Sequence, residues 1–439
     1  MILSINAKFN LITKLFLAKR CGFALQCTSK REVFRLIQRL FRSPVREVPY
    51  HGFMFFFAMA SCAYTSFLNV YLQQLGFGEM IIGLFTTIPT LACLILQPVL
   101  AAAADRSKRP MIMLLVLIGI SVLALLGQYF WQPEHPTTGA AAVMMASHTV
   151  YLTFSGTANA MNTAVLMGHL RRHKVPERYG RLRVSFSLGF TLAGVVVGWI
   201  NTLTNRGFLL FAVAMFLATM GIVPLLPWGE HTQTMKEEKQ RASWKELLSF
   251  KRVWILTGIS FLIAFTNSFA YTFFPTYFMN QEGATESAFG FCITLRTFTE
   301  IPILFLVGWM IKKMGPRLTL LIPALTTIVR WALVALFPTV PVMIATQLFH
   351  GFGYVIYSVV MINYVADHVP VSLGATMQNL VGLITVSAPS LIGGVLGGLI
   401  IETWGMGYAA YIWMLLAVSV LASVLLLIFP DEKAAQTQN

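Results

Sequence analysis

The stretch GEHTQTMKEEKQRASWKELLSFKR, residues 229–252, is a polar run in the middle of a largely apolar chain. Six apolar stretches precede it, and each is long enough to cross a bilayer as a helix, which takes about 20 residues. They lie near residues 52–74, 80–103, 110–131, 139–166, 184–203 and 207–227. Six more follow, near residues 253–279, 286–311, 318–337, 341–366, 373–401 and 406–429. The polar run therefore separates two sets of six predicted transmembrane helices.

The composition is typical of a membrane protein. The 439 residues are 56% hydrophobic and only 11% charged, and the mean hydropathy is +0.71. A soluble globular protein carries about 25% charged residues, so a water-exposed fold could not hold this much apolar surface. The five cysteines have no spacing typical of a zinc site or of a disulfide framework. We therefore expect a bilayer around the chain, and neither a metal nor a cofactor in it.

The net charge of +15 could indicate nucleic-acid binding. All but three of the 32 Lys and Arg residues, however, lie before residue 50, after the second, fourth, sixth and eighth predicted spans, or in the C-terminal tail. The exceptions are Arg206, Arg296 and Arg330. In a twelve-span chain these basic segments share one side of the membrane, and the positive-inside rule makes that side cytoplasmic. We therefore expect an inner-membrane protein with both termini in the cytoplasm and no nucleic-acid partner.

The same pattern predicts the domain boundaries. We expect a basic cytoplasmic extension at 1–49, a six-helix bundle at 50–228, a cytoplasmic linker at 229–252, a second bundle at 253–430 and a cytoplasmic tail at 431–439. Within the extension, KREVFRLIQRLFR (30–42) has apolar residues on one helical face and arginines opposite, which suits an interfacial helix. A transit peptide and a start codon placed too far upstream are the other interpretations. We assign the extension no chemistry and expect it to be dispensable.

The two halves repeat one another. Pro110 and Pro316 follow basic or amphipathic segments at matching places, and Gly198 and Gly398 lie in the glycine-rich segments GVVVG (194–198) and GGVLGG (393–398). Glycines spaced by four residues let transmembrane backbones approach closely. Duplicated helical halves with a central site at mid-membrane are typical of secondary transporters.

Several motifs strengthen this interpretation. DRSKRP (105–110), which follows the second span, resembles the loop motif of the major facilitator superfamily. Four further segments are similar to the branch that contains lactose permease and the phenylpropionate-type permeases: YGRLR (179–183), TEIPILFLVGWMIKKMG (299–315), IVRWALVA (328–335) and QLFHGFGYVIYS (347–358). The resemblance covers about residues 50–430 and implies an all-α membrane protein of twelve transmembrane helices in two pseudo-symmetric six-helix bundles.

Four ionisable residues lie in the middle of predicted spans of the second half: Arg296, Glu300, Arg330 and His350. A charge at mid-bilayer costs at least about 2.5–3.5 kcal/mol, so these groups should face one another across a wet cavity. Arg296 and Glu300 are four residues apart on one helix face, and we expect them to pair. A purely structural ion pair is the other interpretation of these two. The presence of Arg330 and His350 at similar depth favours a functional site.

The resemblance assigns roles to these residues. In the lactose-permease-like branch, the matching carboxylate, arginine and histidine bind substrate and couple proton movement, which implies proton coupling by Glu300, Arg330 and His350. Two carboxylates of that branch are missing here, where Gly353 and Asn162 stand instead. Among the ionisable residues in the interior of the spans, Glu300 is the single carboxylate, so it is the candidate for alternate protonation and ionisation.

The loss of two carboxylates leaves the expected cavity net positive and argues against a galactoside. We expect an aromatic carboxylate bound by Arg330, with Arg183, Asn162, Arg296 and Tyr64 as further substrate-binding residues. The aromatic side chains of spans 1 and 7 have core packing as their other interpretation. His148 is expected to be a hydrogen-bonded packing residue. Asp105, Arg106 and Arg109 are expected to form a cytoplasmic latch between the halves, although positive-inside anchoring also explains the two arginines.

The sequence therefore predicts a monomeric secondary transporter that uses the proton gradient to symport a small organic solute. A nucleoside or sugar proton symporter and a drug or metabolite exporter are the alternatives. An intramembrane enzyme would need catalytic pairs or a metal motif that the chain lacks, and a primary pump would need an ATP-binding loop of the GxxxxGK[ST] type, which is absent. A structural or sensory membrane protein would need neither the repeat nor charges at mid-depth.

Overall fold

The computed structural model describes residues 47–131, 133, 135–175, 178–228 and 244–429. The chain divides into two compact units, Met1–Val48 and Pro49–Asn439, and the second contains almost all of the described residues. The predicted extension at 1–49 and the predicted tail at 431–439 fall almost entirely outside the described residues, as does most of the linker at 229–252.

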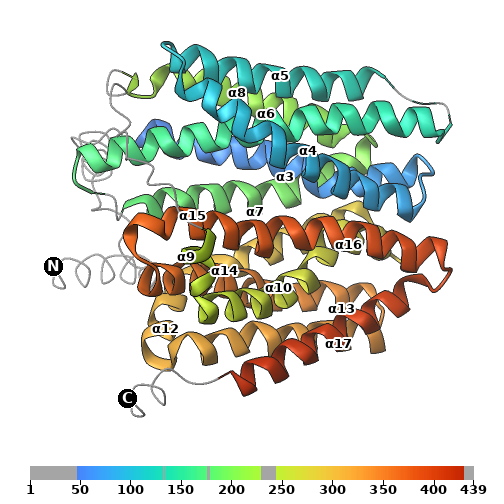
Figure 1. Cartoon of the computed structure of the whole chain (residues 1–439). Helices are drawn as coiled ribbons and strands as arrows, with labels where there is room; N and C mark the ends of the chain where they lie inside the picture. Colours follow the sequence, from blue (N-terminus) through green and yellow to red (C-terminus); the bar gives the residue numbers. More distant parts are fainter. Residues whose placement is uncertain (1–46, 132, 134, 176–177, 229–243, 430–439) are drawn as a thin grey trace, which may run out of the picture. The chain divides into compact units, whose positions relative to one another are not determined.

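The first half of the second unit consists of long helices that run back and forth (Figure 1). They are α3 (Val48–Gln74), α4 (Glu79–Asp105), α5 (Pro110–Phe130), α6 (Thr138–Arg172), α7 (Tyr179–Leu203) and α8 (Gly207–Ile222), and α8 continues into η2 (Val223–Leu225). Pro110 lies in the first turn of α5, where its missing N–H costs nothing, and the Thr137 hydroxyl caps α6 by accepting from the Ala140 N–H at 3.2 Å.

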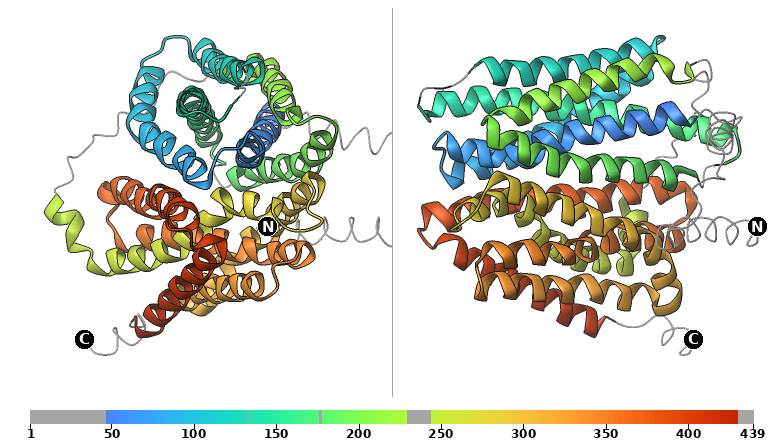
Figure 2. Two further views of the ribbon diagram at one scale, coloured as in Figure 1. Left: turned by 90° about the vertical axis from the view of Figure 1, so that its right-hand side faces the viewer. Right: turned by 180° about the vertical axis from the view of Figure 1, so that it is seen from behind.

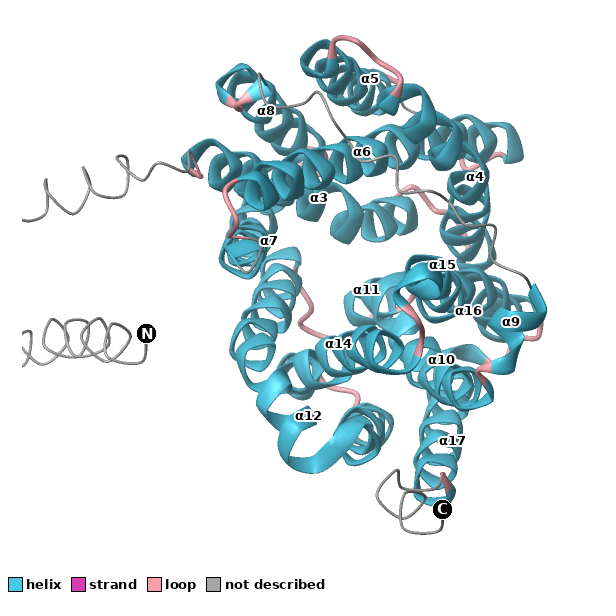
Figure 3. Cartoon of the chain, turned by 60° about the vertical axis from the view of Figure 1, so that its left-hand side comes forward, coloured by secondary structure: helices cyan, strands magenta, loops and turns pink. Residues whose placement is uncertain are grey.

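The second half is helical as well, with several helices divided into segments. They are α9 (Trp244–Ser249), α10 (Lys251–Thr272), α11 (Phe274–Met279), α12 (Glu286–Leu336), α13 (Val340–Ala345), η4 (Thr346–Phe349), α14 (His350–His368), α15 (Val371–Gly382), η5 (Leu383–Ser387), α16 (Ala388–Gly398), η6 (Leu399–Thr403) and α17 (Gly407–Ile428). The described residues contain helices, turns and loops and no strand (Figure 3). The predicted all-α fold class is confirmed.

Ten helices of the described residues are long and apolar enough to cross a membrane. One of them, α12, contains two predicted spans joined at Gly315, whose φ of 78° turns the chain back. The α6 helix covers the predicted span at 139–166 but is less apolar and is not among the ten. The twelve predicted spans therefore correspond to helical segments, while the number that crosses a membrane stays a prediction.

Glycines lie where the backbones of the two halves approach most closely. The α7 helix packs on α12, and α4 packs on α16 (Figures 2 and 3). A Cβ added to Gly290 of α12 would overlap the backbone oxygen of Gly194 in α7, and one added to Gly83 of α4 would overlap that of Gly394 in α16. The glycine-rich segments of the sequence thus bring backbone against backbone at the boundary between the halves, as the spacing predicts.

The two ends of the helices differ. The end with the connections at 106–109, 173–175 and 312–317 is called the basic end, and the end with the connections at 75–78 and 280–285 is called the closed end. Hydrogen bonds between the halves cluster at the closed end. Asn69 Nδ2 donates to the backbone carbonyl oxygen of Thr272 at 2.8 Å, and Gln74 Nε2 donates to Glu286 Oε1 at 2.7 Å.

Candidate functional site

Two adjoining cavities lie between the closed-end contacts and the basic end. The larger has a volume of about 360 Å³ and the smaller about 200 Å³. Both are lined by Thr65 of α3, Thr90 of α4 and Leu152 of α6, so they lie against one another and are described together as one space. Small-molecule sites in proteins have volumes of about 300–1,000 Å³. The space is therefore large enough for a compact organic molecule.

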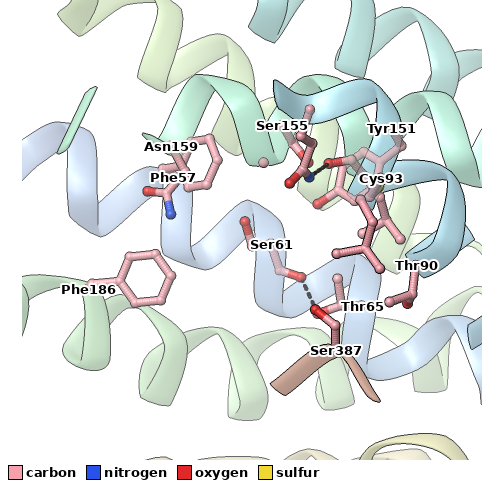
Figure 4. Close-up of a pocket in the computed structure, with 14 residues that line it drawn as sticks. Phe57, Ser61, Thr65, Thr90, Cys93, Tyr151, Ser155, Asn159, Phe186 and Ser387 are labelled. Atoms are coloured by element: carbon pink, nitrogen blue, oxygen red, sulfur yellow. Dashed lines mark hydrogen bonds between the residues drawn. The ribbon is translucent and has the colours of Figure 1, made fainter. Parts of the chain in front are cut away.

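The larger cavity has a polar but uncharged wall. Ser61 of α3, Gln97 of α4, and Ser155 and Asn159 of α6 line it together with three aromatic rings (Figure 4). These rings are Phe57, Tyr151 and Phe186. Almost all of this wall belongs to the first half, and Ser387 of η5 is the contribution of the second half.

The smaller cavity contains a cation. Arg296 of α12 lines it, and its guanidinium carbon lies 4.7 Å from the centroid of the Tyr271 ring. Within the described part of the chain, no carboxylate or other acceptor lies within hydrogen-bonding or ion-pair distance of this guanidinium. Arg296 is therefore a cation at the cavity wall with aromatic contact and no anionic partner.

The predicted pair of Arg296 and Glu300 is not formed. The spacing of four residues does place both side chains on one face of α12, but each turns toward a different neighbouring helix. Arg296 stacks on Tyr271 of α10, while Glu300 Oε1 lies 3.8 Å from His350 Nε2 of α14. Spacing along one helix cannot decide between these partners, because they are supplied by other helices.

Three of the predicted site residues do come together. Arg330 Nη1 lies 3.1 Å from His350 Nδ1, and the other ring nitrogen of His350 lies 3.8 Å from Glu300 Oε1 and 3.1 Å from the Tyr271 hydroxyl. Arg330, His350 and Glu300 thus form a chain across α12 and α14. The described helices bring these residues together as the sequence predicts, but none of the three is among the residues that line the two cavities, where a wet cavity between them was expected.

The donor arrangement determines the tautomer of His350. A guanidinium can only donate, so Nδ1 must accept from Arg330 and carries no proton. In the neutral ring the proton is then on Nε2, which can donate toward Glu300 or Tyr271. A second ring proton would have to displace the hydrogen bond from Arg330. In this state His350 is therefore a neutral donor facing the carboxylate.

Arg330 is the buried end of this chain of side chains and lies at the wall of neither cavity. It is 2% exposed, and its Nη2 donates to Gln347 Oε1 at 3.1 Å. Its guanidinium carbon lies 4.7 Å from the centroid of the Trp331 ring. In this conformation Arg330 holds His350 and Gln347 in place, and Arg296 is the arginine that a solute in the cavity would meet.

The remaining predicted substrate-binding residues have different surroundings. Tyr64 is 0% exposed, and its hydroxyl bonds to Gln128 and, at 2.9 Å, to His148 Nδ1, so it is packed behind the side chain of His148, which lines the smaller cavity, and lines neither cavity itself. A tyrosine in a helical stripe cannot be assigned to cavity or core from sequence, and packing between α3, α5 and α6 decided this one. The same bond confirms that His148 is hydrogen-bonded. Asn162 is 0% exposed, and Arg183 lies 4.3 Å above the Phe186 ring.

The expected latch residues lie at the basic end. Arg106 and Arg109 are exposed at the end of α4 and the start of α5. The side chain of Asp105 is outside what the structure describes, so the latch stays a prediction. Sequence reasoning did not single out Gln97, Ser155, Asn159 or Gln347. Serine, asparagine and glutamine are ordinary packing residues in membrane helices, so they carry no signal that marks a cavity.

Comparison with known proteins identifies the family. A family model described as "MFS_1 like family" matches residues 49–433. The chain is 23% identical to a maltose permease of Geobacillus stearothermophilus over 88% of this chain and 95% of that protein. It is 22% identical to a probable 3-phenylpropionic acid transporter of Escherichia coli over 72% and 80%. Its fold matches a crystal structure of the nucleoside transporter NupG with a TM-score of 0.71 at 15% identity, over 87% of this chain and 98% of that chain. The chain is thus an integral membrane transporter and belongs to the MFS_1 like family of the major facilitator superfamily.

Proposed function

We propose that this transporter moves a small organic acid, with an aromatic carboxylate as the favoured class, together with protons by alternating access. The observation that carries the proposal is Arg296, a cation at the wall of the central cavity with no acceptor within reach among the described residues. A guanidinium at membrane depth is costly unless it is paired. A bound carboxylate would complete the pair through two parallel hydrogen bonds.

Aromatic side chains support a ring as the rest of the solute. Phe57, Tyr151 and Phe186 line the larger cavity, while Tyr271 and Phe289 line the smaller one. Ring faces and edges provide apolar contact and favourable stacking geometry for an aromatic solute. A compact aromatic acid therefore fits both the charge and the surface of the space.

Glu300 is the proposed proton carrier. It is 18% exposed, whereas its neighbour His350 is 0% exposed, so the carboxylate is the more accessible of the two side chains. Protonation of Glu300 removes the negative charge one helical turn from Arg296 and makes the site more favourable for an anion. Binding of the proton and binding of the acid then promote one another, and this linkage is reciprocal. Arg330 and His350 position the carboxylate.

The closed-end contacts support alternating access. They join the two halves on one side of the space, and the state in which they are formed is called the sealed state. We propose that the other state requires these contacts to open while the basic end closes through Asp105, Arg106 and Arg109. We propose that the basic end faces the cytoplasm of a cell whose inner membrane holds the protein, with both termini on that side. We further propose that one chain is sufficient for transport.

A neutral solute is the second candidate. The uncharged polar wall of the larger cavity would suit a nucleoside or a sugar, and the similar proteins include a maltose permease and, by fold, a nucleoside transporter. Such a solute would leave Arg296 without an anionic partner, and for that reason the acid is preferred.

Uptake by purified protein in vesicles tests the proposal. An inwardly directed proton gradient should drive accumulation of 3-phenylpropionate, and a protonophore should abolish it. The neutral amide of the same acid should be taken up at least about tenfold more slowly, since one charge-assisted pair contributes about 1.5–3 kcal/mol. Equal uptake of acid and amide would exclude the acid and favour the neutral solute.

A further inference from the structure

The larger cavity offers more hydrogen-bonding capacity than an unsubstituted aromatic acid can use. The hydroxyls of Thr65 and Thr90 are already satisfied by the Ser61 and Thr86 carbonyl oxygens of their own helices, at 2.7 and 2.6 Å. The Asn159 amide, by contrast, has no hydrogen-bond partner within the described residues. The donors and the acceptor of this amide therefore face the cavity without a protein partner.

Gln97 adds to this capacity through a specific backbone feature. Its Nε2 donates to the Leu152 oxygen of α6 at 3.2 Å, which leaves Oε1 available as an acceptor. A Cβ added at Gly156 would overlap the Gln97 amide. Glycine at position 156 is thus what lets a polar amide lie flat against α6 in the cavity wall. Ser155, directly before this glycine, contributes a hydroxyl to the same wall; it donates to the Tyr151 hydroxyl and keeps its oxygen as an acceptor.

This wall adjoins the Arg296 subsite. Thr65, Thr90 and Leu152 line both cavities, so one molecule can extend from the guanidinium of Arg296 to the polar side chains of α4 and α6. Phe57 and Phe186 flank the polar groups and can cover the faces of a ring. A solute without hydroxyl groups would displace water from these polar groups without replacing its hydrogen bonds.

We infer that the solute is a ring carboxylate that bears several hydroxyl groups, with its carboxylate on Arg296 and its hydroxyls on Gln97, Ser155 and Asn159. The inference rests on the proposed transport of an organic acid and narrows its substrate class. Sites built to hydrogen-bond a hydroxyl reject the analogue that lacks it by up to about 10⁴-fold, whereas apolar contacts discriminate far less. Hydroxyl recognition is therefore the main determinant of specificity here.

Calorimetric binding to the purified carrier at one fixed pH tests this without a proton gradient. Two matched pairs of acids differ mainly in hydroxyl groups: quinate with cyclohexanecarboxylate, and gallate with benzoate. The first pair has an alicyclic ring and the second an aromatic one, so the pairs also tell which ring the site prefers. At least one hydroxylated acid should bind about 10²-fold or more tightly than its partner. Quinamide, which keeps the hydroxyls and loses the charge, should bind at least about tenfold more weakly than quinate.

Variants separate the two parts of the site. Ser155→Ala and Asn159→Leu should each weaken binding of the preferred hydroxylated acid by about tenfold or more and leave its unhydroxylated partner within about twofold. Arg296→Gln should weaken both acids and leave quinamide unchanged. Asn363→Leu is the matched control, because Asn363 is exposed on α14 and its amide bonds to the Val359 oxygen of its own helix at 2.8 Å. Affinity ratios within one variant do not depend on its stability, and Ser155→Ala removes only one atom.

The outcomes are distinguishable. Equal binding of hydroxylated and unhydroxylated acids in both pairs would overturn the hydroxyl subsite and leave transport of an organic acid standing. Equal binding of quinate and quinamide would overturn the Arg296 contact and the acid proposal together. No binding of any of the five probes would overturn the inference, whereas the uptake experiment with 3-phenylpropionate would still decide the proposed function.

Discussion

Glu300 has two neighbours that act on it in different ways. His350, held by Arg330, presents the Nε2 proton toward the carboxylate, while Arg296 lies one helical turn away and stacks on Tyr271. The contact with His350 positions the carboxylate of Glu300. The nearness of Arg296 makes the attraction of the cavity for an anion depend on the charge of Glu300. The state of this one carboxylate therefore determines how strongly the cavity attracts an anion.

Glu300→Gln should separate binding from proton coupling. Glutamine keeps the shape of the protonated acid but cannot titrate, so the variant should bind 3-phenylpropionate at every pH and exchange it across the vesicle membrane. Accumulation driven by a proton gradient should fall to the level of empty vesicles. Counterflow and gradient-driven uptake, measured on the same preparation, check both parts. Wild-type accumulation by the variant would exclude Glu300 as the proton carrier.

The same substitution at two arginines should have two different effects. Arg296→Lys keeps the charge at the cavity wall but loses the fork that grips a carboxylate, so affinity for the acid should fall by about tenfold or more with little change in Tm. Arg330→Lys should mainly destabilise the protein, by about 1–3 kcal/mol, since a lysine leaves His350 or Gln347 without a donor. Calorimetry and thermal unfolding of both variants provide the comparison.

Each arginine variant is the control for the other. A larger loss of affinity in Arg330→Lys than in Arg296→Lys, with unchanged Tm, would show that Arg330 contacts the solute directly in another conformation of the transporter. That result would assign the contact with the solute carboxylate to Arg330, as the sequence resemblance implied.

At the level of helices, α4 has its N-terminus capped by the other half of the protein. Its N-cap residue is Gly78, which has no side chain to satisfy the free N–H groups of the first turn. Glu402 of η6 takes this role, and its Oε2 accepts from the Met80 N–H at 2.8 Å. Glu79 in turn accepts from Thr276 at 3.1 Å and from the Tyr408 hydroxyl. Carboxylates thus hold the closed end together across the boundary between the halves.

Glu402→Ala should loosen this end of α4. An N-cap contributes about 0.5–2 kcal/mol, so opening of the first turn should become about 2- to 30-fold more frequent. Hydrogen–deuterium exchange of a peptide that covers the start of α4 measures this directly. Glu282→Ala is the control, because Glu282 is exposed at the same end. Unchanged exchange in Glu402→Ala would mean that the cap does not stabilise the sealed state.

At the scale of the whole transporter unit, the sealed state depends on backbones that touch. Gly290 of α12 lies against Gly194 and Gly198 of α7 so closely that no side chain fits between them. Opening of the closed end requires these helices to separate. The glycine contact is therefore expected to be present in one transport state and absent in the other, and its strength sets the balance between the two.

Gly290→Ala should shift this balance toward the state that is open at the closed end. Overpacking of a tight contact costs about 1–3 kcal/mol, so gradient-driven uptake should fall by about tenfold. Gly308→Ala is the control, because it is the same substitution in the same helix with the same effect on helix propensity. A Cβ at position 308 meets no atom within 4 Å. Gly308→Ala should retain uptake within about twofold. Equal uptake by both variants would show that the contact does not control the transport cycle.

Much of the fold follows from the sequence because it depends on local properties of the chain. The length and spacing of the apolar stretches predict where the helices lie, and the glycine segments predict where backbones approach. The motifs at 105–110 and 299–358 point to the superfamily that the family match identifies. The meeting of Glu300, Arg330 and His350 also follows, since buried charges at similar depth must face one another.

The partners within the site required the tertiary structure. Sequence spacing placed Arg296 and Glu300 on one helix face, but Tyr271 of α10 and His350 of α14 determined where each side chain turned. Arg330 and Tyr64 became buried behind the cavity, and the polar wall formed by Gln97, Ser155 and Asn159 had no signal of its own. The reason is physical: helix formation is decided by residues that are neighbours in sequence, whereas side-chain partners in a membrane protein are decided by the packing of helices that are distant in sequence.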